Sequence, residues 1–332
     1  MTMMRAVVIA RPGGPEVLEL AQHRVPVPAE GEALVRVRAT ALNRADLLQR
    51  RGHYPAPAGA PAQVPGLEYA GEVVEMGQGV ERWQLGDRVM GIVAGGAHAE
   101  YVVVPASTMV RVPDSLDWQS AGAVPEAFMT AHDALTTQGS VRRGERVVVD
   151  AVGSGVGLAV VQVATVLGAT VFGTTRTAEK LERARAEVGL EAGMVLGASP
   201  DALASEVLAW SEGRGADLMV DLVGGDYLPA GLESLAVKGR LVLVGLLAGR
   251  RAELDMGRLL SRRLTVRGTV LRSRSVEEKE GVAAGFAADV LPHIASGRIH
   301  PVVDRVFPLS EIGEAHAYLE SGDSFGKVVL TP

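Results

Sequence analysis

The spacing of hydrophobic residues changes character near residue 127. Before that point, short apolar or alternating runs are separated by Gly, Pro and polar turns, and they span residues 4–10, 33–39, 70–76, 88–92 and 100–104. Runs of this length and composition are typical of β-strands. A series of strands without intervening helical patterns predicts a small β-barrel or sandwich over residues 1–127.

From residue 128 onward, strand patterns alternate with helical patterns. The expected strands cover residues 147–149, 170–173, 194–196, 217–222, 240–246 and 264–269. The expected helices between them include residues 158–167, 201–212 and 228–235. Six parallel strands with helices on both faces form a doubly wound sheet, so we predict an α/β nucleotide-binding domain at residues 128–269. Residues 270–332, with a helix expected at 276–296 and a strand at 327–330, are expected to return to the first domain.

A glycine-rich turn follows the first strand of this second domain. The β-branched run 147–149 leads into residues 151–157, which hold three glycines at alternate positions. Such a turn lets the backbone approach a ligand, and the helix start behind it offers N–H groups to a pyrophosphate. The strict G-x-G-x-x-G spacing is not met, because Leu158 stands where the third glycine is expected. A dinucleotide site is favoured, with a ligand-free turn as the alternative; Val244 and Gly245, after the fifth strand, would line the same crevice.

The end of the second strand of this domain indicates which dinucleotide is preferred. Folds that bind NAD usually place an acidic residue there to hold the ribose 2′-hydroxyl, but residues 173–176 contain no acid. Arg176 and Lys180 flank the position instead. In the first turn of the next helix, Lys180 opposes the helix dipole, and a bound 2′-phosphate would relieve that repulsion. We expect a preference for NADPH; the alternative is that both cations are ordinary surface charges.

Composition narrows the chemistry further. The 332 residues include no cysteine and seven histidines, none of which are spaced i,i+4, so we expect no disulfide, no thiolate nucleophile and no metal site. A net charge of −6 without a dense basic run argues against nucleic acid as a partner. No apolar run is long enough to span a membrane, and residues 1–10 have a strand pattern instead of a signal peptide. We therefore expect a cytoplasmic protein.

Six short motifs are distributed over the whole chain. They are Ala-Leu-Asn-Arg-Ala-Asp at 41–46, Pro-Gly-Leu-Glu-Tyr-Ala-Gly at 65–71, Gly-Asp-Arg-Val at 86–89, Thr-Ala-His-Asp-Ala-Leu at 130–135, Ala-Val-Gly-Ser-Gly-Val-Gly at 151–157 and Gly-Arg-Leu-Val at 239–242. Together they resemble the zinc-independent quinone oxidoreductases of the medium-chain dehydrogenase/reductase superfamily. The Ser-Gly-Val-Gly turn, with residues 270–274 and 291–293, is most similar to the p53-inducible quinone oxidoreductase branch. The resemblance implies a GroES-like β-barrel catalytic domain joined to a doubly wound Rossmann sheet.

The resemblance also implies the site residues. Zinc-dependent relatives carry Cys where this chain has Asn43 and His where it has Leu67, so no catalytic zinc is implied. The implied catalytic residues are Asn43, near the nicotinamide ribose, and Tyr54, at the border of the quinone pocket. The implied cofactor-binding residues are Asn43, Thr130, Ser154, Gly155, Val156, Thr174, Arg176, Lys180, Val244, Gly245, Leu271 and Lys327. Asp150 stands where a His is common before the turn, and its role is left open.

The implied reaction is hydride transfer from NADPH to a quinone without a metal. The protein would orient the cofactor, exclude water and shape the pocket. Tyr54 is a possible proton donor, and solvent is the alternative, because a reduced quinone is a comparatively acidic phenol. Asp46 is expected to be a structural hydrogen-bond acceptor, and His98 and His132 to be part of the scaffold.

Two other functions compete with this one. An NADPH-dependent 2-alkenal or enoyl reductase would use the same fold and cofactor, and only a substrate panel separates it from a quinone reductase. An RNA-binding, crystallin-like role is the alternative of another class, and the net negative charge argues against it. We also expect a homodimer through residues 264–270, because this edge strand would otherwise be unpaired.

Overall fold

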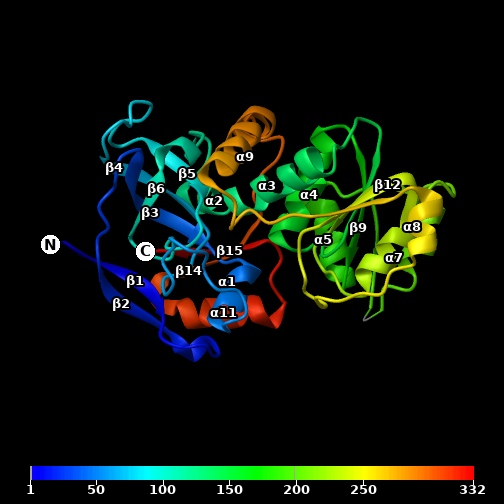
Figure 1. Ribbon diagram of the computed structural model, residues 1–332, viewed down its shortest axis with the longest axis horizontal. Helices are drawn as coiled ribbons and strands as arrows, with labels where there is room; N and C mark the ends of the chain where they lie inside the picture. Colours follow the sequence, from blue (N-terminus) through cyan, green and yellow to red (C-terminus); the bar gives the residue numbers. More distant parts are fainter. Residues whose placement is uncertain (1, 198) are drawn as a thin grey trace. The chain divides into compact units, whose positions relative to one another are not determined.

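Two units, each with its own core, divide the chain. The computed structural model describes residues 2–197 and 199–332. One unit combines Met1–Met129 with Leu271–Pro332, and the other is Thr130–Val270 (Figure 1). These divisions lie within two residues of the domain boundaries expected from the sequence.

A six-stranded sheet forms the centre of the second unit. Its strands are β8 (Arg146–Val149), β9 (Thr170–Thr175), β10 (Ala192–Val195), β11 (Ala216–Asp221), β12 (Leu235–Leu243) and β13 (Thr265–Gly268). Their order is β10-β9-β8-β11-β12-β13, and every neighbouring pair is parallel. The predicted doubly wound sheet is confirmed, although β12 begins five residues earlier than predicted. The order reverses between β8 and β11, which is where such sheets bind ligands.

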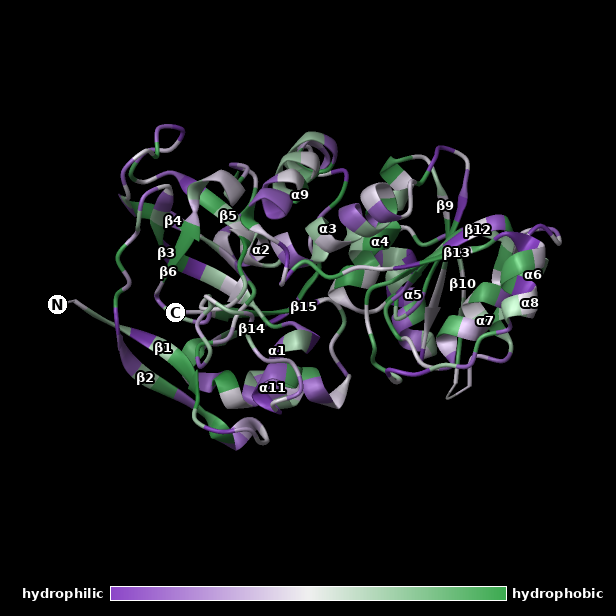
Figure 2. Cartoon of the chain, in the orientation of Figure 1, coloured by the Kyte–Doolittle hydropathy of each residue, from purple (hydrophilic) through white to green (hydrophobic). Residues whose placement is uncertain are grey.

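Helices cover both faces of this sheet. They are α4 (Gly155–Val166), α5 (Ala178–Val188), α6 (Leu203–Trp210), α7 (Tyr227–Ser234) and α8 (Met256–Arg262). Figure 2 shows α4 and α5 on one side of the strands and α6, α7 and α8 on the other. This division follows from right-handed crossovers that run outward in opposite directions from β8 and β11.

The first unit is mainly β-structure. Its strands are β1 (Met3–Ile9), β2 (Leu18–Arg24), β3 (Glu32–Ala41), β4 (Glu68–Met76), β5 (Arg88–Ile92), β6 (Tyr101–Pro105), β7 (Val110–Arg111), β14 (Val303–Pro308) and β15 (Lys327–Thr331). β3 pairs with β4 on one edge and with β6 and β15 on the other, while β1 and β2 form a separate antiparallel pair. This is the GroES-like β-domain that the resemblance implied. The sequence prediction missed β2, β7 and β14, since β2 is largely polar, β7 has only two residues and charged residues interrupt β14.

Short helices complete the first unit, and two predictions about them were wrong. No helix was expected among the strands of residues 1–127, but one lies between β3 and β4, where its short length left no clear helical pattern. The helices are α1 (Arg44–Arg50), α2 (Trp118–Gly122), α3 (Pro125–His132), α9 (Val276–Asp289), α10 (Leu291–Ala295) and α11 (Ile312–Ser321), and a π-helical turn, Asp133–Gln138, follows α3. A single helix was expected over residues 276–296, but the structure splits it after Asp289. Pro292 explains the break, because proline lacks an N–H and its ring clashes with the carbonyl four residues earlier.

The membrane prediction concerns helix length and hydropathy. No helix in the described part of the chain is both long enough and apolar enough to cross a bilayer.

Candidate functional site: a dinucleotide turn and a buried charge cluster

The turn between β8 and α4 is shaped for a close backbone approach. Ser154 caps α4, and its Oγ accepts a hydrogen bond of 3.1 Å from Gly157 N. A Cβ on Gly157 would lie 2.5 Å from Ala151 O, so only glycine fits there. No hydrogen bond to another described residue engages the N–H groups of Gly155 and Val156. Free donors at the start of a 12-residue helix form an anion site that fits a pyrophosphate.

The chain after β12 is tied to the end of the neighbouring strand β11. Val244 N and Gly245 N both donate to Asp221 O, which ties the chain after β12 to the end of β11. A Cβ on Gly245 would lie 2.2 Å from Leu222 O. The residue must therefore be glycine for this close approach. Val244 and Gly245 thus lie at the carboxyl edge of the sheet, on the same edge as the turn at Ser154.

The end of β9 is where the sequence predicts recognition of a ribose phosphate. Thr174 is buried, and its carbonyl accepts a hydrogen bond from Val152 N, which joins β9 to the turn. Thr177 caps α5 by accepting from Lys180 N. Arg176 is exposed and Lys180 is partly exposed, both at the start of α5. The described residues 173–177 include no carboxylate that would repel a 2′-phosphate.

Two buried carboxyl groups lie under the turn, and sequence reasoning missed their relation. Asp150 and Asp221 stand at the ends of the adjacent strands β8 and β11, and both are 0% exposed. Asp150 Oδ1 accepts from Leu222 N at 2.6 Å, and Asp221 Oδ1 accepts from Val223 N and Gly224 N at 2.8 and 2.7 Å. Neither Oδ2 has a hydrogen-bond partner among the described residues.

A proton between these two acids would satisfy both of the free oxygens. Burial, followed by the charge of Asp221 and a hydrogen bond to it, raises the pKa of Asp150 well above its usual value. A hydrogen bond between two carboxyl groups requires one of them to be protonated. The open question about Asp150 thus has a structural answer: it is a buried acid with a raised pKa, beside Asp221, at the point where the strand order reverses.

In the first unit, Asn43 belongs to a buried charge cluster. Lys327 Nζ donates to Glu68 Oε1, Asn43 Oδ1 and Leu42 O at 2.7, 2.7 and 3.1 Å. Asn43 Nδ2 donates to the same Glu68 oxygen at 2.9 Å. All three protons of the ammonium are thereby used, so a cofactor contact from Lys327 would need one of these bonds to break.

Asp46 supports the cluster from α1. Its two oxygens accept hydrogen bonds from the backbone N–H groups of Asn43 and Gly66. The prediction that Asp46 is a structural acceptor is confirmed. His98 and His132 are buried, as expected for scaffold residues.

Tyr54 lies beside a buried arginine. The guanidinium carbon of Arg272 lies 5.0 Å from the centre of the Tyr54 ring. Burial raises the pKa of Tyr54, and the charge of Arg272 opposes that increase. The phenol is therefore protonated at neutral pH, and the cation–π contact holds its ring in place.

Glu126 is a further ionisable residue at this cluster that sequence reasoning missed. Its backbone N–H donates to Glu68 Oε2 at 2.8 Å. Burial, with the Glu68 charge second, raises the pKa of Glu126 to about 8, while Lys327 and Arg272 oppose the rise. The side chain thus holds a proton at neutral pH. The only sequence signal was a glutamate in the first turn of an otherwise apolar helix.

Most of the expected site residues fall into two sets, and Thr130 and Leu271 belong to neither. The turn and strand-end residues Ser154, Gly155, Val156, Thr174, Arg176, Lys180, Val244 and Gly245 gather at one edge of the second unit's sheet. Asn43 and Lys327 contact each other in the first unit, where Tyr54 also lies. Thr130 and Leu271 are both buried and stand at the ends of their units.

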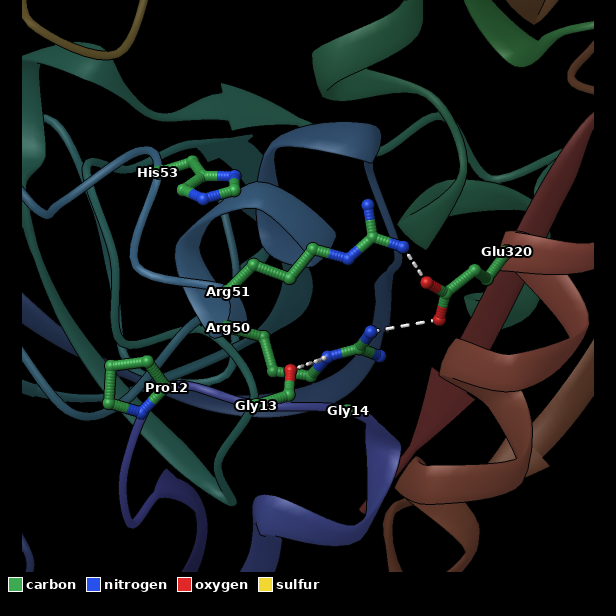
Figure 3. Close-up of a pocket in the computed structure, with 7 residues that line it drawn as sticks. All are labelled: Pro12, Gly13, Gly14, Arg50, Arg51, His53 and Glu320. Carbon is green, nitrogen blue, oxygen red and sulfur yellow. Dashed lines mark hydrogen bonds and ion pairs between the residues drawn. The ribbon is translucent and has the colours of Figure 1, made fainter.

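A hollow elsewhere in the first unit contains none of these residues. It measures about 360 Å³ and is lined by Pro12, Gly13, Gly14, Arg50, Arg51, His53 and Glu320 (Figure 3). Arg50 donates to Gly13 O at 3.1 Å and pairs with Glu320 at 2.8 Å, and Arg51 pairs with the same carboxylate. Because Glu320 of α11 pairs with both Arg50 of α1 and the adjacent Arg51, we assign the hollow to the packing of α1 against α11.

The described residues provide no metal-binding cluster. No group of three or more His, Cys, Asp or Glu side chains in residues 2–197 and 199–332 could hold a metal ion. Asn43 and Leu67 occupy the positions where zinc-dependent relatives carry ligands, and Leu67 is buried and apolar.

Comparisons with known proteins agree with this fold. Residues 29–114 match the alcohol dehydrogenase GroES-like domain, and residues 155–286 match the zinc-binding dehydrogenase domain. A quinone oxidoreductase from Pseudomonas aeruginosa is 32% identical over 331 residues, covering 99% of this chain and 100% of the relative. A mycobacterial protein solved in complex with NADPH has a TM-score of 0.88 and 32% identity, over 99% of this chain and 100% of that one. The JamJ enoyl reductase has a TM-score of 0.88 and 26% identity, over 99% of each chain.

A GroES-like β-domain and a Rossmann sheet with a glycine turn define a pyridine-nucleotide oxidoreductase of the medium-chain dehydrogenase/reductase class. Within that class, the chain belongs to the zinc-independent quinone oxidoreductase family.

Proposed function

We propose that this protein is a metal-free, NADPH-dependent quinone reductase. The single observation that carries the proposal is the β8–α4 turn, whose free N–H groups at Gly155 and Val156 fit a pyrophosphate. The quinone acceptor is proposed from the name of the relatives, and NADPH from the mycobacterial relative solved with it. Arg176 and Lys180, together with the lack of an acid among the described residues 173–177, support the choice of NADPH over NADH.

The chain's own residues have three tasks in this reaction. Bound NADPH supplies the hydride. Gly155 and Val156 would hold the diphosphate, while Arg176 and Lys180 would hold the 2′-phosphate. The charge cluster keeps Asn43 fixed, so that it can orient the nicotinamide ribose. Tyr54 would form a wall of the acceptor pocket and exclude water.

Two groups in the first unit can hold a proton for the reduced acceptor. Tyr54 has its pKa raised by burial, and burial raises the pKa of Glu126 to about 8. Either could donate to an oxygen of the reduced quinone and then be reprotonated from water. The phenol was expected from the sequence, and the carboxyl group is added by the structure.

A substrate panel tests the proposal. NADPH oxidation is followed with ortho-quinones, naphthoquinones, enones, aldehydes and alcohols at equal concentrations. We expect turnover of quinones and none of alcohols. Absence of NADPH oxidation with every quinone would refute the proposed reaction.

The second candidate is an NADPH-dependent reductase of activated alkenes. It is favoured by the similarity to the JamJ enoyl reductase over 99% of both chains. Faster turnover of enones or enoyl thioesters than of quinones in the same panel would select it.

We also propose a homodimer through β13. Among the described strands, β13 pairs with β12 alone, and all four of its residues are exposed. Val266 and Val270 are exposed large hydrophobic residues on this edge. Strand pairing with a second copy would satisfy the free backbone groups. A monomer in sedimentation at micromolar concentration would contradict this.

A further inference from the structure

The segment that carries Tyr54 has no secondary structure of its own. Residues 51–65, between α1 and β4, contain neither helix nor strand and include four prolines. A long irregular segment keeps one conformation only if other parts of the fold hold it. Backbone hydrogen bonds from Ile9, Gly96 and His98 hold its last residues, 63–65. The part around Tyr54 is held by one buried side chain, Arg272, which follows Leu271 at the start of the returning segment.

Arg272 forms hydrogen bonds at three points of the first unit. Its guanidinium donates from Nε to Ala94 O at 2.8 Å, from Nη1 to Tyr54 O at 3.2 Å and from Nη2 to Gln49 Oε1 at 2.6 Å. The cation also lies over the Tyr54 ring. It therefore fixes both the backbone and the side chain of the same residue.

Gln49 connects Arg272 to the far end of the segment by hydrogen bonds. Its Nε2 donates to Ala62 O at 3.2 Å while its Oε1 accepts from Arg272. Lys279, from α9, donates to the carbonyl of Arg272 at 3.0 Å and fixes the backbone from which the guanidinium extends. Two carbonyls of the irregular segment, at positions 54 and 62, are thus tied to one cation.

Burial of the Arg272 charge costs free energy, and a role in stability alone does not explain why an arginine stands there. Arg272 is only 5% exposed, and no carboxylate among the described residues forms an ion pair with it. Its partners are neutral oxygens, which compensate a buried charge less well than a carboxylate does. An aliphatic side chain would pack there at lower cost but could not hold two carbonyls and a ring in a planar, fixed geometry.

We propose that Arg272 is a positioning residue for the acceptor: it fixes the Tyr54 ring and the surrounding segment, so a side chain that does not touch the acceptor sets which acceptors are reduced. The proposal rests on the proposed function, in which Tyr54 is a wall of the acceptor pocket. Weakening the contacts of Arg272 lowers the fraction of molecules in which the Tyr54 ring is in place. The apparent affinity for the acceptor falls in proportion to that fraction.

The main test compares Arg272→Lys with the wild-type protein. Lysine keeps the charge but loses the planar fork. We expect the KM for the quinone to rise about tenfold, with kcat changed less than about twofold and the Kd of NADPH unchanged. Arg305→Lys is the matched control, because Arg305 also lies over a tyrosine ring, Tyr318, at 4.1 Å and belongs to the same unit. It should leave the quinone KM unchanged.

A double-mutant cycle separates positioning from a general loss of structure. If Arg272 acts through Tyr54, adding Arg272→Lys to Tyr54→Leu should raise the KM by less than about twofold further. Independent, multiplicative effects would overturn the proposal. An unchanged quinone KM in Arg272→Lys, with wild-type activity present, would also overturn it.

Hydrogen exchange of the full-length chain gives a readout that does not depend on activity. In Arg272→Lys and in Gln49→Met, which leaves the guanidinium in place, exchange should increase at residues 53–65 and remain unchanged in β3 and β4. Unchanged exchange at residues 53–65 in both variants would refute the proposal that Arg272 holds this segment in place. If exchange increases in the variants as expected but the wild-type protein reduces no quinone, the proposed function is refuted and the positioning of the segment by Arg272 is not. The two failures are therefore distinguishable.

Discussion

The shared proton of Asp150 and Asp221 makes stability fall as pH rises, and Asp150→Asn should remove that dependence. In the folded protein, burial first and Asp221 second raise the pKa of Asp150 above its unfolded value. The native state therefore holds a proton that the unfolded chain has already lost. The contribution of Asp150 to the free energy of unfolding is fully present below the unfolded pKa, about 3.9. It is lost as pH rises towards the folded pKa.

The size of this pH dependence follows from the one extra proton that the folded protein holds. Where the native state binds one more proton than the unfolded chain, stability decreases by about 1.4 kcal/mol for each pH unit. In Asp150→Asn, the new side chain would keep its oxygen on Leu222 N, as Asp150 does at 2.6 Å, and its amide would donate permanently to Asp221. Glu126, whose pKa is raised to about 8, adds a slope of the same sign in both proteins, so their difference isolates Asp150.

Urea denaturation at pH 5, 6, 7 and 8 measures this difference. The wild-type stability should fall relative to Asp150→Asn by about 1.4 kcal/mol per pH unit until the folded pKa is passed. Asp201→Asn, at an exposed position, is the control and should parallel the wild type. Parallel curves for the wild type and Asp150→Asn would refute the shared proton.

Three further predictions concern the cofactor turn and the charge cluster. Lys180→Ala should weaken NADPH binding about 10- to 100-fold in calorimetry, because a charge-assisted bond to the 2′-phosphate is lost, and should leave NADH binding unchanged. Gly245→Ala should lower the free energy of unfolding by about 1–3 kcal/mol in urea, because the new Cβ lies 2.2 Å from Leu222 O. Lys327→Met should cost about 3–5 kcal/mol in thermal unfolding, because it leaves the buried Glu68 carboxylate without its cation.

Each of these has a matched comparison. Glu179→Ala, beside Lys180, should leave the ratio of NADPH to NADH affinity at least as high as in the wild type; a loss equal to that of Lys180→Ala would contradict phosphate recognition. Gly281 has open space around it, so Gly281→Ala should not destabilise, and equal losses at both glycines would contradict the close approach. Arg38 pairs with Glu72 at the surface, and Arg38→Met should cost less than about 1 kcal/mol.

The sequence predicted the second unit well because its signals are local. The β-branched run at 147–149, the glycines at 151–157 and the stop at Gly168, which has a φ of +84°, each act over a few residues. Parallel strands buried on both faces have continuous apolar runs, so β8 and β11 were recognisable. The split of α9 from α10 was missed because the apolar pattern continues past Pro292.

The charge cluster could not be predicted in the same way. Asn43, Glu68 and Lys327 are far apart in the sequence, and only the pairing of β3 with β4 and β15 brings them together. Each residue alone has the pattern of a surface charge. The shared proton of Asp150 and Asp221 depends likewise on β8 and β11 being neighbours, which strand order decides.

Calorimetric titration of the full chain with NADPH, and separately with NADH, tests the central claim most directly. The account predicts one NADPH per chain, bound more tightly than NADH, with weaker binding in Val156→Pro, which removes one of the two free N–H donors at the start of α4. No detectable NADPH binding by the intact protein would contradict it.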